Sequence, residues 1–175
     1  GDTGPAQSAR GPLTADIGAG ATLRKGNGTN STGFAGISTL TNAGTVDVTV
    51  GMLELSGSGT STNAFTVASG STLQFTGGTP TWSGSSSVTG AGTVSFLGGT
   101  QTINGTYNLT GATSVTNGIV TFGAGATLTS LGTALTLVSS GGGTLNLAGH
   151  NVALTTLTQA GATLTGTGTV TVSGA

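Results

Sequence analysis

The sequence contains no cysteine, and only three of its 175 residues are lysine or arginine. Without cysteine the chain can form neither a disulfide framework nor a Cys-ligated zinc site. Three basic residues cannot build the basic patch that nucleic-acid binding requires, so no nucleic-acid partner is expected. No apolar run reaches the roughly 18 residues of a membrane-spanning helix, so no membrane span is expected either.

Charge as a whole is scarce, at 4% of residues against about 25% in ordinary globular chains, and the net charge is −1. Glycine is abundant, with 35 residues, and 34% of residues are hydrophobic. One apolar residue in three is enough for a buried core, and the length suits one domain. The first twenty residues lack the basic and apolar regions of a secretory signal. Because the chain starts at Gly1, we expect a processed product or an excised piece.

One five-residue pattern recurs along the chain: a small residue is followed by a threonine, an apolar residue, a polar residue and an apolar residue. Its copies begin about 21 to 27 residues apart. The copies are Gly44-Thr45-Val46-Asp47-Val48, Ser71-Thr72-Leu73-Gln74-Phe75, Gly92-Thr93-Val94-Ser95-Phe96, Gly118-Ile119-Val120-Thr121-Phe122, Gly143-Thr144-Leu145-Asn146-Leu147 and Gly168-Thr169-Val170-Thr171-Val172. Alternation of apolar and polar residues indicates short strands, and this density of glycine, threonine and valine disfavours helices.

The pattern therefore predicts an all-β chain folded as a three-sided parallel β-solenoid of six or seven coils of about 25 residues. If each copy stacks on the next, the apolar positions form two inward columns. The first column would be Val46, Leu73, Val94, Val120, Leu145 and Val170. The second would be Val48, Phe75, Phe96, Phe122, Leu147 and Val172. A register slip of one residue would turn every core side chain to water, so the stacking should be strongly specified.

The pattern also divides the chain. Residues 1–19, with Pro5 and Pro12, depart from it and are predicted to be an N-terminal cap or a linker, and residues 20–175 the solenoid. Lys25 takes an inward position, where we expect an open end at which its ammonium reaches water. The last copy has no cap, and an uncovered strand edge invites pairing. Either further repeats follow, or another molecule stacks there head to tail.

Two segments carry a family resemblance: SSSVTGAGTVSFLGGTQTINGTYNLTGATSVTNGIVTF, from Ser85, and AGATLTGTGTVTVSG, from Ala160. They resemble the repeats of bacterial filamentous-haemagglutinin-like adhesins and autotransporter passenger domains, and the resemblance covers residues 20–175. It implies a right-handed parallel β-helix that is exported and projects from the cell surface. It transfers no catalytic residue, no metal and no cofactor to this chain.

Few side chains offer chemistry. Asp47 and Glu54 are the only carboxylates of the predicted repeats, and such a pair could in principle hydrolyse a glycosidic bond. Arg24 and Asp47 each lie two residues after a repeat threonine, so they should be neighbours on successive coils and form a surface ion pair. The single histidine, His150, has no nearby partner for a metal site and is expected at an exposed corner.

Two sets of residues are candidates for ligand binding. Threonines of the repeat would stack into one outward row, of which Thr45, Thr72, Thr93, Thr144 and Thr169 are the members, with Ile119 as an exception. Such a row could bind ice, but an ice-binding face normally has two adjacent rows, and the neighbouring column is mixed. Trp82 and Tyr107 could each stack on a sugar, although a buried aromatic is the simpler interpretation.

The sequence thus predicts an extracellular structural or adhesive protein and no enzyme: a stiff stalk or fibre segment of a bacterial surface protein. Three alternatives stay open: a fibre subunit that stacks end to end, an ice-binding or carbohydrate-binding β-helix, and a polysaccharide-degrading enzyme. Its partners would be further copies of itself, or a host-surface or glycan ligand.

Overall fold

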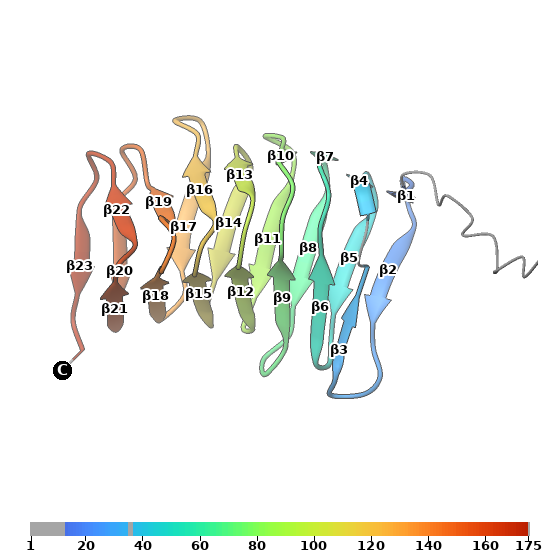
Figure 1. Ribbon diagram of the computed structural model, residues 1–175, viewed down its shortest axis with the longest axis horizontal. Helices are drawn as coiled ribbons and strands as arrows, with labels where there is room; N and C mark the ends of the chain where they lie inside the picture. The colour runs from blue at the N-terminus through green and yellow to red at the C-terminus, as the bar shows by residue number, and fades with distance from the viewer. Residues whose placement is uncertain (1–12, 35–36, 175) are drawn as a thin grey trace, which may run out of the picture.

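The computed structural model describes residues 13–34 and 37–174, and their regular structure is entirely β. Short strands follow one another around three sides and stack into a parallel β-solenoid of about eight turns. Figure 1 shows the turns stacked along the long axis, from blue β1–β3 to red β23. The predicted fold class is therefore confirmed. Among the described residues no helix has the length and apolarity that a membrane crossing requires.

The first side, sheet A, is a parallel sheet of eight strands. Its strands are β1 (Leu13–Ile17), β4 (Ile37–Asn42), β7 (Gly59–Ser61), β10 (Pro80–Trp82), β13 (Thr100–Ile103), β16 (Ile119–Phe122), β19 (Thr144–Asn146) and β22 (Thr163–Thr165). With strands about 4.8 Å apart, eight of them give a rod roughly 35 Å long. β1 lies within the segment predicted as cap or linker, so the solenoid already includes Leu13; residues 1–12 lie outside the described part.

Two further sides complete the coil, and both are again wholly parallel. Sheet B contains six strands: β2 (Thr22–Lys25), β5 (Thr45–Val48), β8 (Ala64–Val67), β11 (Ser87–Gly90), β14 (Thr106–Leu109) and β17 (Thr127–Leu131). Sheet C contains seven: β3 (Ser31–Gly33), β6 (Met52–Leu55), β9 (Thr72–Phe75), β12 (Thr93–Phe96), β15 (Ala112–Val115), β18 (Ala134–Val138) and β21 (Thr156–Ala160). A short sheet D pairs β20 (Val152–Leu154) with β23 (Val170–Val172).

The interior is a mainly apolar column to which all three sides contribute. Near its middle, Trp82 of sheet A stacks on Phe65 of sheet B, with ring centroids 5.0 Å apart, and contacts Phe75 of sheet C at 5.1 Å. Phe75 in turn stacks on Phe96 of the next turn at 5.5 Å. Such ring pairs contribute about 0.5–1.5 kcal/mol each beyond burial of their area. The shared aromatic cluster therefore locks the three sheets to one another.

The predicted columns are wrong in one respect, because the turns are shorter and less regular than 25 residues. Hydrogen-bonded partners such as Val46 and Phe65 are 19 residues apart, whereas Ile119 and Thr144 are 25 apart. Successive copies of the five-residue pattern therefore do not stack on one another, and they lie on different sides of the coil. Val46 lies in sheet B, Leu73 and Val94 in sheet C, Val120 and Leu145 in sheet A, and Val170 in sheet D. All of these except the half-buried Val170 are buried, so the pattern marks a strand but not the side on which it lies.

The second predicted column is divided in the same way. Val48 lies in sheet B, Phe75 and Phe96 in sheet C, and Phe122 in sheet A. Leu147 follows β19 and is buried, whereas Val172 of β23 is 43% exposed. The prediction that this position points inward thus holds for every copy but the last.

A hydroxyl residue at the corners joins one turn to the next. In each case its N–H and its side-chain hydroxyl both donate to the same carbonyl of the preceding turn, the hydroxyl at 3.1–3.4 Å. These residues are Thr49, Thr62, Thr76, Thr110, Thr133, Thr167 and Ser173. Because each such bond contributes about 0.5–1.5 kcal/mol, the corners account for part of the threonine content.

Candidate functional site

The predicted threonine row does not form, because its members lie on different sides of the coil. Thr45 pairs with Thr22 in sheet B, and Thr72 pairs with Thr93 in sheet C. Thr144 belongs to sheet A, and Thr169 precedes β23. The residues that were expected to act together as one ligand face are therefore separated.

A different set of threonines forms two adjacent rows on the outer surface of sheet A. We call these two rows the threonine face. The first row consists of Thr39, Ser58, Thr79, Thr100, Ile119, Thr144 and Thr163. The second row, two residues further along each strand, consists of Thr41, Thr60, Thr81, Thr102, Thr121, Asn146 and Thr165. Every position but Ser58, Ile119 and Asn146 is threonine.

The ladder of sheet A establishes the register of both rows. Thr60 pairs with Thr81, Thr81 with Thr102, and Thr102 with Thr121. In the first row, the hydroxyls of Ser58 and Thr79, which lie on successive turns, form a hydrogen bond of 2.9 Å. Because alternate residues of a strand point to the same face, both rows project outward while Leu40, Gln101 and Val120 between them point into the core.

The threonine face, from β4 to β22, has no charged member. The nearest charge in its register is Asp16 of β1, opposite Thr41 at the N-terminal margin. Sheet B carries the ion pair of Arg24 and Asp47 on its outer surface, and sheet C presents Glu54, in register with Gln74. Sheet A therefore presents two neutral rows of seven positions each, composed mainly of threonine, which neither of the other two sides does.

Within the described residues, the hydroxyls of the threonine face form no hydrogen bond with the protein apart from the contacts between Ser58 and Thr79. The corner threonines are the opposite case, since each donates to a carbonyl of the turn before it. The members of the face are all at least partly exposed. Their hydroxyls are thus accessible for hydrogen bonds with water.

Trp82 and Tyr107, the candidates for sugar stacking, are both in the core, with exposed fractions of 1% and 0%. Neither ring is available to stack on an external sugar. The Tyr107 hydroxyl lies 2.9 Å from Thr113 Oγ1, and Thr113 donates to the carbonyl of Leu131 at 2.6 Å. Burial raises the pKa of Tyr107 well above its ordinary value, and the bond to Thr113 opposes this shift.

The few charged residues are spread over the solenoid. Arg24 and Asp47 are in register, and Arg24 Nε donates to Asp47 Oδ2 at 2.9 Å, which confirms the predicted ion pair. Asp47 Oδ1 also accepts a bond of 2.7 Å from Thr66. Glu54 lies on sheet C, so the two carboxylates considered for glycoside hydrolysis occupy different sides of the coil.

Lys25 and His150 depart from expectation. Lys25 was expected to reach water but is buried, and its ammonium donates to the carbonyls of Asn27 and Gly28. His150 was expected to be exposed but is half-buried, with Nε2 3.0 Å from the Gly123 carbonyl oxygen. Because a carbonyl only accepts, Nε2 carries the proton of that bond. No group of three or more potential metal-ligating side chains occurs in the described part of the chain.

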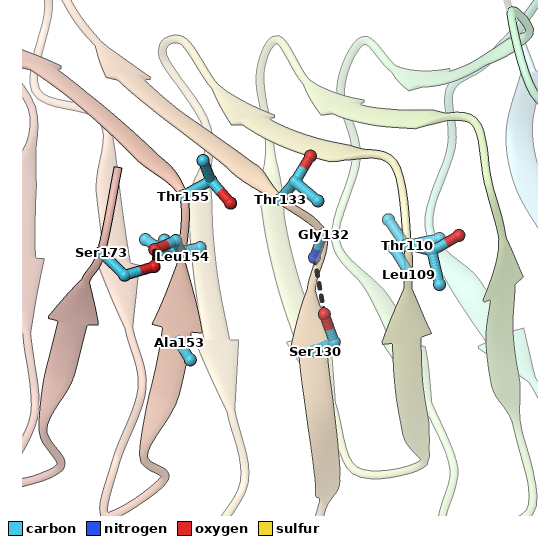
Figure 2. A pocket seen from close by; sticks show the side chains of 9 residues that line it. All are labelled: Leu109, Thr110, Ser130, Gly132, Thr133, Ala153, Leu154, Thr155 and Ser173. Atoms are coloured by element: carbon cyan, nitrogen blue, oxygen red, sulfur yellow. Dashed lines mark hydrogen bonds between the residues drawn. The ribbon is translucent and has the colours of Figure 1, made fainter. Parts of the chain in front are cut away.

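A hollow of about 280 Å³ opens where sheet B is interrupted (Figure 2). Tyr107 pairs with Leu128 and Asn108 with Ser130, so Thr129 is an extra, bulged residue in β17. Beyond β17 the ladder stops, and β20 pairs with β23 alone. Thr133, Thr155 and other hydroxyl residues line the hollow, together with Leu109 and Leu154, and no ionisable side chain does.

The sequence contains only a weak signal for the threonine face, in the recurring form threonine, any residue, threonine. It occurs on the face at residues 39–41, 79–81, 100–102 and 163–165, but also at 127–129 in sheet B and 156–158 in sheet C. These copies are separated by unequal intervals, so a search for one fixed period passes over them. No protein-family model, curated protein or solved structure matches the chain.

Proposed function

We propose that this solenoid is a structural or adhesive segment of an exported bacterial surface protein, in which it serves as a stiff spacer. The observation that carries the proposal is the continuous apolar core enclosed by three parallel sheets along the described chain. Each turn shares its ladder and core with its neighbours, which favours a stiff rod whose length grows with the number of turns.

The surface supports the same proposal. It is rich in hydroxyls and poor in charge, and lysine and arginine, at which many proteases cleave, number only three in the whole sequence. The outer carboxylate of Asp47 is engaged by Arg24 and Thr66, which favours a structural role for that residue over a catalytic one.

The test of the proposed location uses antibodies raised against the purified chain and intact cells of the source bacterium. We expect equal labelling before and after the cells are permeabilised, because an exported spacer is accessible from outside. Treatment of intact cells with a broad-specificity protease should then remove the label. Labelling that requires permeabilisation would contradict an exported surface role.

End-to-end association is a second candidate. In the described structure β22 and β23 have no further strand on their outer side, and Leu164 of β22 and Val170 of β23 are only half-buried. A second copy stacked there would continue the ladders and cover these side chains. Size measurement by light scattering over a wide range of protein concentration tests this; a mass that stays that of one chain throughout counts against it.

A further inference from the structure

We propose that the threonine face of sheet A binds ice. The inference does not depend on the proposed role as a spacer. It rests on the geometry of two neighbouring rows, Thr39 to Thr163 and Thr41 to Thr165, that run along one side of the solenoid.

The face is a two-dimensional lattice with fixed spacings. Successive members of one row are about 4.8 Å apart along the rod, and the two rows lie about 6.7 Å apart along the strands. Both repeats are close to distances between water oxygens on crystal planes of ice. A protein side with this regularity can therefore hold waters at several lattice points at once.

The side chains suit an ordered water layer. Threonine is β-branched and has few χ1 rotamers in a strand, so the hydroxyls and methyls are held in place before any ligand arrives. In the part of the chain that the structure describes, the hydroxyls make no protein bonds other than those of Ser58 and Thr79, and so they can bond with lattice water. The methyl groups order the water that covers them. Ile119, 42% exposed within the first row, presents only apolar surface and interrupts the hydroxyls without adding charge.

Other ligands fit this face less well. A sugar surface is usually recognised by exposed aromatic rings, and Trp82 and Tyr107 are both buried. A charged polymer or ion needs ionisable partners, and none of the face's fourteen positions supplies one. A plane of crystalline water is neutral and periodic, and it matches both properties of the face.

The experiment compares a substitution on the threonine face with a matched one elsewhere. In Thr102→Tyr a bulky ring stands in the centre of the face and separates it from a flat crystal plane. Thr93→Tyr is the control, since Thr93 is also a partly exposed, outward strand residue but lies on sheet C. Circular dichroism and thermal unfolding should show that both variants keep the fold.

Thermal hysteresis, the gap between the melting and freezing points of a single ice crystal, is the measurement. We expect hysteresis and faceted crystals with the unaltered chain, loss of most of the hysteresis in Thr102→Tyr, and little change in Thr93→Tyr. An unaltered chain that neither delays freezing nor shapes the crystal overturns the proposal. Equal losses in two well-folded variants would also overturn it, because binding would not reside on sheet A.

Discussion

Gln101 is a polar side chain enclosed in an otherwise apolar part of the interior. It is 0% exposed, and neither its amide nitrogen nor its amide oxygen has a hydrogen-bond partner. In the register of sheet A it is followed by Val120, which can offer it no side-chain bond. Tyr107 is also enclosed, yet Thr113 satisfies its hydroxyl at 2.9 Å. An unpaired buried polar group costs about 1–3 kcal/mol, so Gln101 lowers the stability of the coil around it.

Replacement of Gln101 by methionine should therefore stabilise the protein. Gln101→Met keeps an unbranched side chain of similar size and removes the two unpaired atoms, for an expected gain of about 1–3 kcal/mol. The measurement is the midpoint of thermal unfolding, which should rise. Thr113→Val is the comparison and should lower the midpoint, because it leaves the Tyr107 hydroxyl without its partner. A lower midpoint in Gln101→Met would show that the amide has a partner in solution.

At the level of the strand, glycines permit the close approach of successive turns. Gly90 ends β11 with a φ of +131°, in the region that disfavours other residues, and a Cβ there would lie 2.0 Å from the Val67 carbonyl oxygen. Gly125, between β16 and β17, has open space around it. Glycine is therefore required at Gly90, where two turns approach closely, whereas the loop at Gly125 has room for a side chain.

Alanine at these two positions should have very different effects. Gly90→Ala combines a strained φ with a backbone clash and should cost more than about 2 kcal/mol of stability. Gly125→Ala should change stability by no more than about 0.5 kcal/mol in either direction. Thermal unfolding of both variants checks the difference. Similar midpoints would mean that β8 and β11 can move apart at Gly90 and Val67 at little cost in stability.

For the molecule as a whole, the interruption of sheet B makes the stack uneven. Sheet A continues through β19 to β22, and sheet C through β18 to β21, whereas β20 has no ladder with β17. The bulge at Thr129 lies in β17, on this side of the coil, and an extra residue of this kind disrupts the local pairing pattern. In a repeat protein, stability is the sum of contributions from neighbouring turns, so one weak junction lowers the cooperativity of the stack.

Hydrogen exchange should reveal this junction. We expect the amides of β20 to exchange faster than those of β5, although each lies one strand from the end of its series, because β5 is paired on both sides. Exchange followed by mass spectrometry of peptides that cover the two strands is the measurement. Equal protection would show that β17 and β20 are tightly joined despite the missing ladder.

Much of the architecture could be read from local pattern. Alternation of apolar and polar residues, as in Thr72-Leu73-Gln74-Phe75, established the strands and which side chains point inward, because a strand has a period of two whatever surrounds it. The vertical pairing of Arg24 with Asp47 also followed from the sequence, since both have the same offset from a repeat threonine. These features depend on neighbours within one strand or one turn.

The side on which each strand falls was decided only by the tertiary structure. Corners take up different numbers of residues, so successive turns measure 19 residues in one place and 25 in another. A period in the sequence therefore does not map onto a column in space. That is why Thr45 and Thr72 lie on separate sheets while Thr81, Thr102 and Thr121 form one row: hydrogen-bonded register, summed over irregular corners, brings them together.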